Sequence, residues 1–174
     1  MDRAADAAGM ARIAQPEAFT GMKPAPFSFD CFVNWGDCDP AGVIFTPRVF
    51  DFFMRALEAW YVEFLGHDFF AMQNAWGFGS PTVRTGCEYL KVLRAGQAFR
   101  LELRVKEVGA ASIRFIGEAL DGTEAPCFRI DHTVCSIEPG TFQPKRFPPE
   151  VRRRIVDYQT SCGDGGNPEN GVET

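Results

Sequence analysis

The pattern of hydrophobic and polar positions predicts one long helix at residues 47–66. Pro47 suits the first helical position, Thr46 suits the cap before it, and Gly66 suits the end. The apolar residues recur at intervals of three and four positions: Val49, Phe50, Phe53, Leu57, Trp60, Tyr61 and Phe64. Further apolar residues extend this surface round most of the helix, so we expect it to be buried on most sides.

Five other segments follow a period of two and are predicted as strands. They are residues 27–35, 82–93, 97–108, 112–120 and 127–138. Residues 67–81 are interpreted as a connector, and 148–159 as a short closing helix. This order predicts an α+β fold, in which an antiparallel five-stranded sheet wraps around the long helix.

Composition separates one folded domain from two terminal segments. Residues 1–25 show no sustained periodicity and are predicted as a flexible leader. Residues 161–174 are rich in Gly, Asn and acidic side chains, a composition typical of disorder. We therefore expect a single domain over residues 26–160, without internal repeats.

The overall charge and hydropathy exclude several classes of partner. The formal net charge is −5 and the pI is about 5.1, so no basic field attracts a nucleic acid. No apolar run is long enough to cross a membrane, and the first residues lack the apolar stretch of a secretory signal. We expect a cytoplasmic protein. The 17 Phe residues must fill a core, line a pocket or lie between subunits.

The six Cys residues do not form a recognisable metal or disulfide pattern. No pair has C-x-x-C spacing, and His67 and His132 are the only imidazoles. A zinc site is therefore not expected, and the cysteines are interpreted as buried reduced thiols.

The segment between the first strand and the long helix is the strongest candidate for chemistry. Its residues 36–42 place Asp37 and Asp39 in a tight turn, just before a helix N-terminus with free N–H groups. A carboxylate beside an oxyanion-binding helix start supplies two of the parts needed for acyl transfer. The alternative is that both acids only hydrogen-bond the turn, as Asx residues often do.

This segment resembles a signature of the hotdog-fold acyl-CoA thioesterase superfamily, most closely the 4-hydroxybenzoyl-CoA thioesterase type. The matching residues are Gly36-Asp37-Cys38-Asp39-Pro40-Ala41-Gly42, without a gap. The order of elements over residues 27–159 agrees with that fold in pattern. The resemblance implies hydrolysis of an acyl-CoA thioester to the free acid and CoA.

The resemblance also implies roles for individual residues. The second acid of the motif, Asp39, would attack the thioester carbonyl directly or activate the hydrolytic water. The backbone N–H of Thr46 would bind the developing oxyanion, and Pro47 has no N–H to offer. Asp37 is interpreted as shaping the loop. Many relatives have Tyr or His where Thr46 stands, so the substrate preference does not transfer directly.

The resemblance places the acyl pocket next to this loop, with a far wall that the partner subunit often supplies. Candidate substrate-binding residues are Trp35, Phe45, Trp76, Gly79, Ser80 and Pro81. These aromatic residues favour an aromatic acyl group, with short aliphatic groups as an alternative. For Trp76 to Pro81, the alternative is an ordinary loop before a strand.

Two further expectations concern coenzyme A and assembly. The turn at residues 109–111 lacks the basic residues that relatives often use for the nucleotide, so Lys145 and Arg146 are the candidates for phosphate binding. The Arg run at 152–154 is interpreted as a solvated face. The resemblance implies a homodimer joined edge to edge, commonly paired again into a tetramer. No metal or redox cofactor is implied, since the CoA thioester is the substrate.

Two rival functions follow from the same residues. A hydratase or dehydratase on this fold would carry a His where Gly42 stands, and no nearby His replaces it. A non-catalytic module that binds acyl-CoA or an aromatic ligand is the stronger rival, because Thr46 and the uncharged turn depart from the usual pattern.

Overall fold

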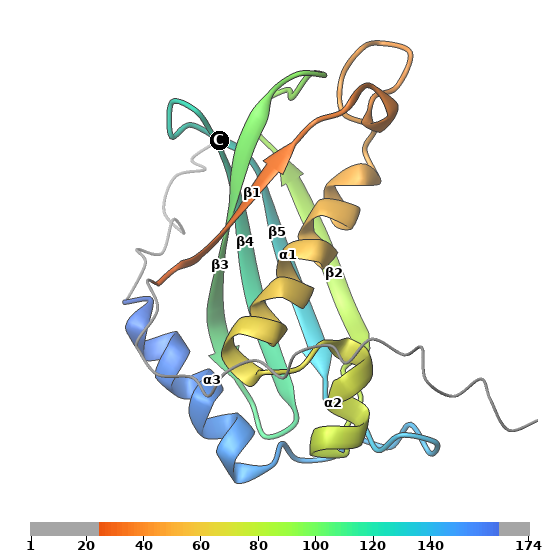
Figure 1. Ribbon diagram of the computed structural model, residues 1–174, viewed down its shortest axis with the longest axis vertical. Coiled ribbons are helices and arrows are strands. Elements are labelled where there is room, and N and C mark those ends of the chain that lie inside the picture. Colours follow the sequence, from red (N-terminus) through yellow and green to blue (C-terminus); the bar gives the residue numbers. More distant parts are fainter. Residues whose placement is uncertain (1–24, 164–174) are drawn as a thin grey trace, which may run out of the picture.

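A computed structural model describes residues 25–163 and contains the predicted five-stranded antiparallel sheet (Figure 1). Its strand order is β1-β3-β4-β5-β2, so β1 and β2 form the two edges. The strands are β1 (Phe27–Phe32), β2 (Thr82–Tyr89), β3 (Ala98–Val108), β4 (Ser112–Asp121) and β5 (Pro126–Cys135). Hairpin turns join β3 to β4 and β4 to β5, whereas β2 and β3 are consecutive in the chain but not paired.

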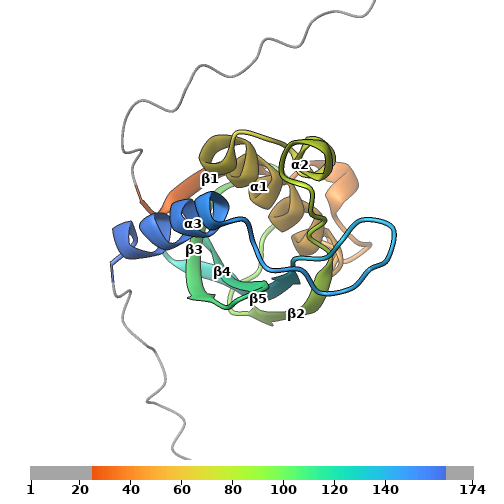
Figure 2. The same ribbon diagram turned by 90° about the horizontal axis from the view of Figure 1, so that it is seen from below.

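Three helices accompany the sheet: α1 (Arg48–Leu65), α2 (Phe69–Trp76) and α3 (Pro149–Ser161). The curved sheet wraps around α1, which lies along its concave face, while α3 packs beside the sheet at the β3 side (Figures 1 and 2). The α+β architecture predicted from the order of elements is thus confirmed.

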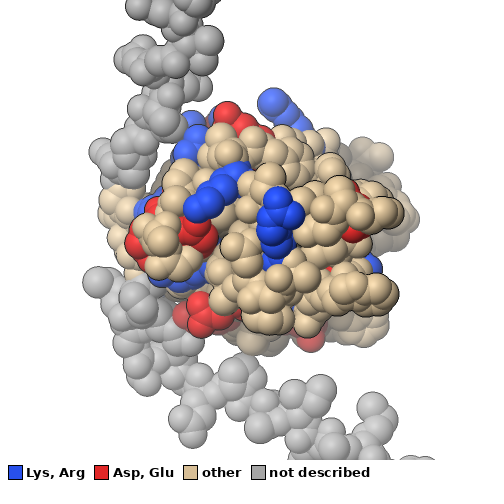
Figure 3. Space-filling model, turned by 90° about the horizontal axis from the view of Figure 1, so that it is seen from above, with Lys and Arg blue, Asp and Glu red and all other residues tan. Residues whose placement is uncertain are grey.

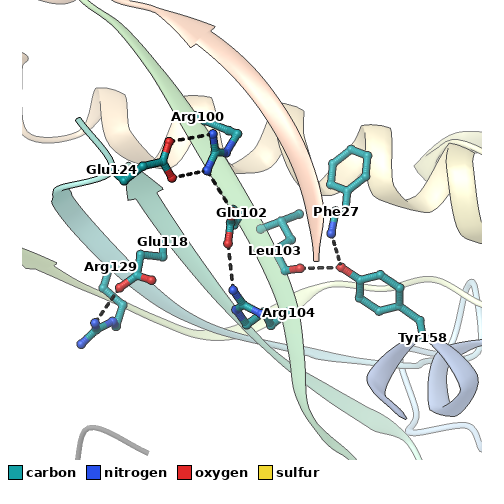
Figure 4. A network of polar contacts seen from close by, with 9 residues as sticks. All are labelled: Phe27, Arg100, Glu102, Leu103, Arg104, Glu118, Glu124, Arg129 and Tyr158. Carbon is teal, nitrogen blue, oxygen red and sulfur yellow. Dashed lines mark hydrogen bonds and ion pairs between the residues drawn. The ribbon is translucent and has the colours of Figure 1, made fainter. Parts of the chain in front are cut away.

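Alternating side chains on β3, β4 and β5 separate an apolar inner face from a charged outer face. The inner residues include Leu101, Leu103, Ile113, Phe115 and Ile130, all fully buried. On the outer face, an ion pair joins Arg129 of β5 to Glu118 of β4, and Arg100 pairs with Glu102 on its own strand and with Glu124 in the turn between β4 and β5 (Figure 4). This alternation is why a period of two was visible in the sequence.

Helix α1 buries one broad apolar face and leaves one stripe to solvent. The buried residues are Val49, Phe52, Phe53, Ala56, Leu57, Trp60, Tyr61, Phe64 and Leu65. Gly117 of β4 lets the sheet approach this face, since a Cβ there would lie 2.7 Å from Cε2 of Phe53. The exposed stripe contains Asp51, Met54, Arg55, Glu58 and Val62. The helix is therefore buried on most of its circumference, as its composition indicates.

The helix boundaries differ slightly from the predicted ones. Helix α1 begins at Arg48, with Pro47 in the cap position and no side-chain cap bond, so the prediction of a Thr46 cap is wrong. Pro47 nevertheless has helical dihedral angles (φ −66°, ψ −21°), so it starts the helical path. Gly66 ends the helix with a left-handed φ of 82°, as predicted.

Helix α2 lies within the segment interpreted as a connector, and that interpretation is wrong for residues 69–76. The side chain of Asp68 caps it by accepting a hydrogen bond from the Ala71 N–H at 2.6 Å, and Gly77 ends it with a φ of 67°. Met72 is its buried residue. One buried apolar position is too little for a helical period to stand out.

Helix α3 is held to the sheet by the hydroxyl of Tyr158. This oxygen accepts a hydrogen bond from the Phe27 N–H at 2.8 Å and donates one to the Leu103 carbonyl (Figure 4). One side chain therefore links α3 to an edge strand and to a central strand.

The edge strand β2 is bare in the single chain. It pairs with β5 on one side, and seven of its eight residues are exposed. Val83 is 60% exposed, and Tyr89, Leu90 and Val92, at and just beyond its end, are 45–55% exposed. An edge strand with unpaired backbone groups and some exposed apolar side chains is a template for further strand pairing.

Other features of the sequence have simple outcomes. The predicted leader 1–25 and tail 161–174 lie almost wholly outside the described residues. All six cysteines are free, but among them Cys31 and Cys127 alone are buried. Burial raises the pKa of the Cys31 thiol to about 12. Within the described chain, no helix is long and apolar enough to cross a membrane.

Candidate active site

The candidate loop, residues 33–47, folds into a small hairpin at the N-terminal end of α1. Cys38 and Ile44 form its bridge, and the Phe45 N–H donates to the Asp37 carbonyl at 2.8 Å. The Ile44 N–H donates to the Leu93 carbonyl at 2.8 Å, which fixes the hairpin to the segment after β2. Gly42 closes the turn with a φ of 74°, a region that favours glycine. The backbone of the loop is therefore held before any ligand binds.

Asp39 lies at the turn of this hairpin and is half-buried. Its Oδ1 accepts a hydrogen bond from the Ala41 N–H at 2.8 Å, and its backbone N–H donates to Val43 at 2.9 Å. No described residue donates a hydrogen bond to its Oδ2. The carboxylate is thus oriented through one oxygen, while the other is available to a water or a substrate.

Both oxygens of the Asp37 carboxylate, by contrast, contact neighbouring residues of the loop and of α1. Its Oδ2 accepts a hydrogen bond from the Asn34 N–H at 2.9 Å, which caps the 3₁₀ turn η1 (Trp35–Asp37). Its Oδ1 lies 3.8 Å from Nε of Arg48 at the start of α1. These contacts agree with the interpretation that Asp37 shapes the loop.

Thr46 presents a free backbone donor at the start of α1. The Phe45 N–H donates to the Asp37 carbonyl, and the Arg48 N–H donates to the Phe45 carbonyl. Pro47 has no backbone N–H. No described residue accepts a hydrogen bond from the Thr46 N–H. The carbonyl of Thr46 accepts a hydrogen bond from the Tyr89 hydroxyl at 2.9 Å, which ties this residue to the end of β2. An amide held in this way at a helix N-terminus can bind an oxyanion.

Two predicted aromatic residues lie within the loop and are open to solvent. Trp35 is 88% exposed in η1, and Phe45 is 50% exposed next to the Thr46 amide. Exposed aromatic surface beside polar donors is typical of a site that receives an apolar ligand.

The other predicted pocket residues lie at the opposite end of α1 within one protomer. The Ser80 hydroxyl is 2.8 Å from the hydroxyl of Tyr61, near the end of α1. At a rise of 1.5 Å per residue, Tyr61 lies about 22 Å along the helix from Thr46. Gly79 pairs with Ile137, and the Pro81 carbonyl accepts from Cys135. The structure therefore does not bring these residues together with Asp39 in a single chain.

Trp76 is likewise packed away from the loop. Its ring lies 6.0 Å from the His67 ring and 5.6 Å from the Arg154 guanidinium carbon, and its indole N–H is buried without a partner among the described residues. The substrate-binding roles of Trp76, Gly79, Ser80 and Pro81 stay predictions that require a second copy of the chain.

The basic residues that are candidates for phosphate binding lie at these same two ends. Lys145 donates to the Gly77 carbonyl at 2.7 Å and pairs with Glu138, and Arg146 is exposed beside it. At the Asp39 end, the backbone of Arg94 forms an isolated β-bridge with Val43. The Arg94 guanidinium group has no partner among the described residues.

Figure 3 looks onto the end of the molecule at which α1 begins, where exposed Lys and Arg side chains, and some Asp and Glu side chains, lie among uncharged surface. Sequence reasoning missed Arg94 as a candidate for phosphate binding. Residues 43 and 94 are far apart along the chain, and nothing local signals their pairing.

The described residues contain no group of three His, Cys, Asp or Glu side chains that could hold a metal ion. The polar groups of the candidate site are a carboxylate, a free amide and nearby guanidinium groups.

Comparison with known structures identifies the class of fold. A hypothetical protein from Staphylococcus aureus, in a complex with CoA, matches with a TM-score of 0.78 at 14% identity, over 87% of this chain and 94% of that one. A 1,4-dihydroxy-2-naphthoyl-CoA thioesterase from Synechocystis matches with a TM-score of 0.69 at 17% identity, over 75% and 96%. A DHNA-CoA thioesterase from S. aureus matches with a TM-score of 0.70 at 17% identity, over 80% and 95%. These likenesses show a hotdog fold.

Sequence comparison then gives the family. The model of the thioesterase-like superfamily matches residues 33–155, which include the whole loop, α1 and the sheet from β2 to β5. The chain therefore belongs to the thioesterase-like superfamily. No curated protein matches the sequence significantly.

Proposed function

We propose that this protein is an acyl-CoA thioesterase of the 4-hydroxybenzoyl-CoA thioesterase type. The observation that carries the proposal is the hairpin of residues 36–46, in which an oriented Asp39 carboxylate and an unpaired Thr46 amide share one rigid loop. Membership of the thioesterase-like superfamily supports the same chemistry.

In the proposed reaction, the thioester carbonyl oxygen accepts a hydrogen bond from the Thr46 N–H. In one route, Asp39 removes a proton from a water molecule while that water attacks the carbonyl carbon. In the other route, the Asp39 carboxylate attacks this carbon and forms an anhydride, which water then cleaves. In both routes the C–S bond breaks, CoA leaves as the thiolate, and this thiolate is finally protonated. One donor aimed at the oxyanion typically contributes about 10²–10³ in rate.

The acyl group is proposed to be aromatic, as in a hydroxybenzoyl group. Trp35 and Phe45 offer exposed aromatic surface beside the Thr46 amide. Structural neighbours that act on dihydroxynaphthoyl-CoA and gentisyl-CoA support an aromatic acyl group over a short aliphatic one. No metal or redox cofactor takes part in the proposed reaction.

We further propose that two copies pair through β2, with each active site at the interface. Antiparallel pairing places the start of one β2 beside the end of the other. Gly79, Ser80 and Pro81 of one copy would then approach the Thr46 loop of the other, because Tyr89 at the end of β2 is bonded to Thr46. Lys145 and Arg146 of the copy that supplies Gly79, together with Arg94 of the copy that supplies Thr46, would be near enough to bind CoA phosphates. Pairing of dimers into a tetramer stays a prediction.

The decisive experiment is a thiol-release assay with a panel of aromatic and aliphatic acyl-CoAs, run on the wild type and Asp39→Asn. Asparagine keeps an oxygen for the Ala41 N–H but removes the charge, so the loop should stay folded. We expect kcat to fall at least about 10²-fold, with an unchanged Tm. Asp157→Asn, an exposed carboxylate on α3, serves as the control with wild-type kcat.

Two outcomes would reject this function. An Asp39→Asn variant with more than half the wild-type kcat would exclude a role for the carboxylate. Saturable acyl-CoA binding without hydrolysis by the wild type would identify a binding module. Within an active enzyme, a single turnover in oxygen-18 water that labels the Asp39 carboxylate would identify the anhydride route.

A further inference from the structure

The segment between β5 and α3 forms a rigid hairpin with an exposed aromatic residue at its tip. Ile137 pairs with Pro144, the Glu138 N–H donates to Gln143 at 2.9 Å, and the Phe142 N–H donates to Glu138 at 3.0 Å. Phe142 is 74% exposed. We call residues 138–144 the β5–α3 hairpin.

The conformation of Phe142 is unfavourable for an isolated surface residue. Its φ is 58°, in the left-handed region that side chains rarely adopt and that Asn or Gly tolerates better. A strained backbone that presents a large apolar ring to solvent is typical of a position with a ligand or partner contact.

The β5–α3 hairpin lies at one end of β2, and the Asp39 loop lies at the other. Ile137, at the base of the hairpin, pairs with Gly79, which precedes β2, whereas Tyr89 at the end of β2 binds Thr46. Both segments project beyond β2 on the same side of the molecule (Figures 1 and 2). A second strand that pairs with β2 would therefore lie between two overhanging loops.

A two-fold axis at the edge of β2 would place the start of β2 in one copy beside the end of β2 in the other. The β5–α3 hairpin of one copy then meets the Asp39 loop of the other, while in its own chain it stays at the far end of α1. We propose that Phe142 forms a wall of the acyl pocket on the partner subunit and selects planar aromatic acyl groups. This inference rests on the proposed function and dimer.

The chemistry of the composite pocket supports this selection. Phe45 is half-exposed beside the oxyanion donor, and Trp35 is almost fully exposed in the same loop. An aromatic acyl group between these rings and a Phe142 ring from the other copy would make edge and stacking contacts, which a short aliphatic group cannot.

The first test compares the wild type with Phe142→Asn. Asparagine suits the positive φ and removes the ring, so the hairpin should keep its shape. We expect the ratio of kcat/KM for benzoyl-CoA to that for butanoyl-CoA to fall about tenfold or more, with an unchanged Tm. Val62→Asn, at a half-exposed site on the outer face of α1, should leave the ratio unchanged.

The same preference can be measured without turnover. Thioether analogues of the two acyl-CoAs cannot be hydrolysed, and calorimetry gives their Kd values. A tenfold loss of preference for the aromatic analogue in Phe142→Asn supports the inference even if the wild type does not hydrolyse thioesters. A preference within twofold of the wild type would overturn it while leaving the thioesterase proposal intact.

A mixed dimer tests whether Phe142 acts across the interface. One protomer carries Asp39→Asn, the other carries Phe142→Asn, and two affinity tags isolate the heterodimer. If Phe142 acts in trans, one of the two sites contains both Asp39 and Phe142, and the heterodimer regains wild-type selectivity. Selectivity equal to that of the Phe142→Asn homodimer, or a monomeric wild type, would contradict the inference.

Discussion

His132 is enclosed by apolar groups on the inner face of the sheet. Its ring lies 4.8 Å from the Phe53 ring, its Nε2 lies 3.3 Å from the Thr82 hydroxyl, and its Nδ1 has no partner among the described residues. The side chain is 2% exposed. Burial lowers the pKa from 6.5 to about 4, against the opposing effect of the Asp131 charge. The folded protein therefore holds this imidazole neutral.

The lowered pKa predicts a loss of stability in mild acid. Between pH 6.5 and pH 4 the unfolded chain binds a proton that folded His132 does not, so the free energy of unfolding falls as the pH falls. We expect a loss of about 2 kcal/mol between pH 7 and pH 4.5. Urea unfolding at several pH values, on the wild type and on His132→Leu, measures it.

His132→Leu should remove most of this slope, because leucine does not titrate. Below about pH 4 both proteins should still lose stability. Lys91 and Arg114 hold the pKa values of Asp121 and Asp131 below their usual range, and protonation of these carboxylates removes that stabilisation. An identical slope in both proteins above pH 4.5 would refute the assignment to His132.

The residues of the candidate loop were predictable because their signal is local. Asp39 and Thr46 lie within a short contiguous segment, and a turn rich in Gly, Asp and Pro before a helical pattern indicates their arrangement. The contact of Arg94 with Val43 could not be predicted, since it depends on how the end of β2 packs on the loop. The same limit applies to the exposure of Phe142.

At the scale of elements, the Tyr158 hydroxyl joins α3 to two strands of the sheet. Tyr158 is buried, and its oxygen satisfies the Phe27 N–H and the Leu103 carbonyl. Tyr158→Phe removes both hydrogen bonds and leaves a buried N–H unpaired. We expect a loss of about 1–3 kcal/mol in the free energy of unfolding, measured by urea denaturation.

The neighbouring residue provides the control for this measurement. Gln159 donates a hydrogen bond from its side chain to the Lys106 carbonyl at 2.8 Å, but this contact is exposed. Gln159→Ala should cost less than about 0.5 kcal/mol, as surface changes usually do. If the two variants lose equal stability, the Tyr158 hydroxyl does not anchor α3.

The elements themselves were predictable wherever they have a buried and an exposed face. Strands β3, β4 and β5 alternate because one side packs on α1 and the other carries ion pairs. Helix α2 was missed because it buries a single residue, although Asp68 and Gly77 mark its ends. Periodicity records burial, so elements that bury little leave little trace in a sequence.

At the scale of the whole molecule, the exposed edge of β2 predicts association. Lysine at Val83 and Val92 would place charges on the apolar part of this edge. We expect the double variant to raise the dimer Kd at least tenfold, measured by analytical ultracentrifugation, with a parallel fall in thioesterase activity. The physical reason is that burying a charged side chain in an apolar contact removes its hydration, which costs free energy.

Val62→Lys, on the exposed stripe of α1, distinguishes this edge from other apolar surface. It should leave the dimer Kd and the activity unchanged. Equal dissociation of both variants would point to an interface on the helix face. A double variant that dimerises like the wild type would exclude pairing through β2.

The bare edge of β2 also has a consequence for the time course of refolding. For the proposed dimer, a chain that has folded alone still lacks a complete site, and its completion is a second-order event. Activity after dilution from denaturant should therefore return later than secondary structure. The delay should shorten in proportion to protein concentration, since each chain must wait to meet another.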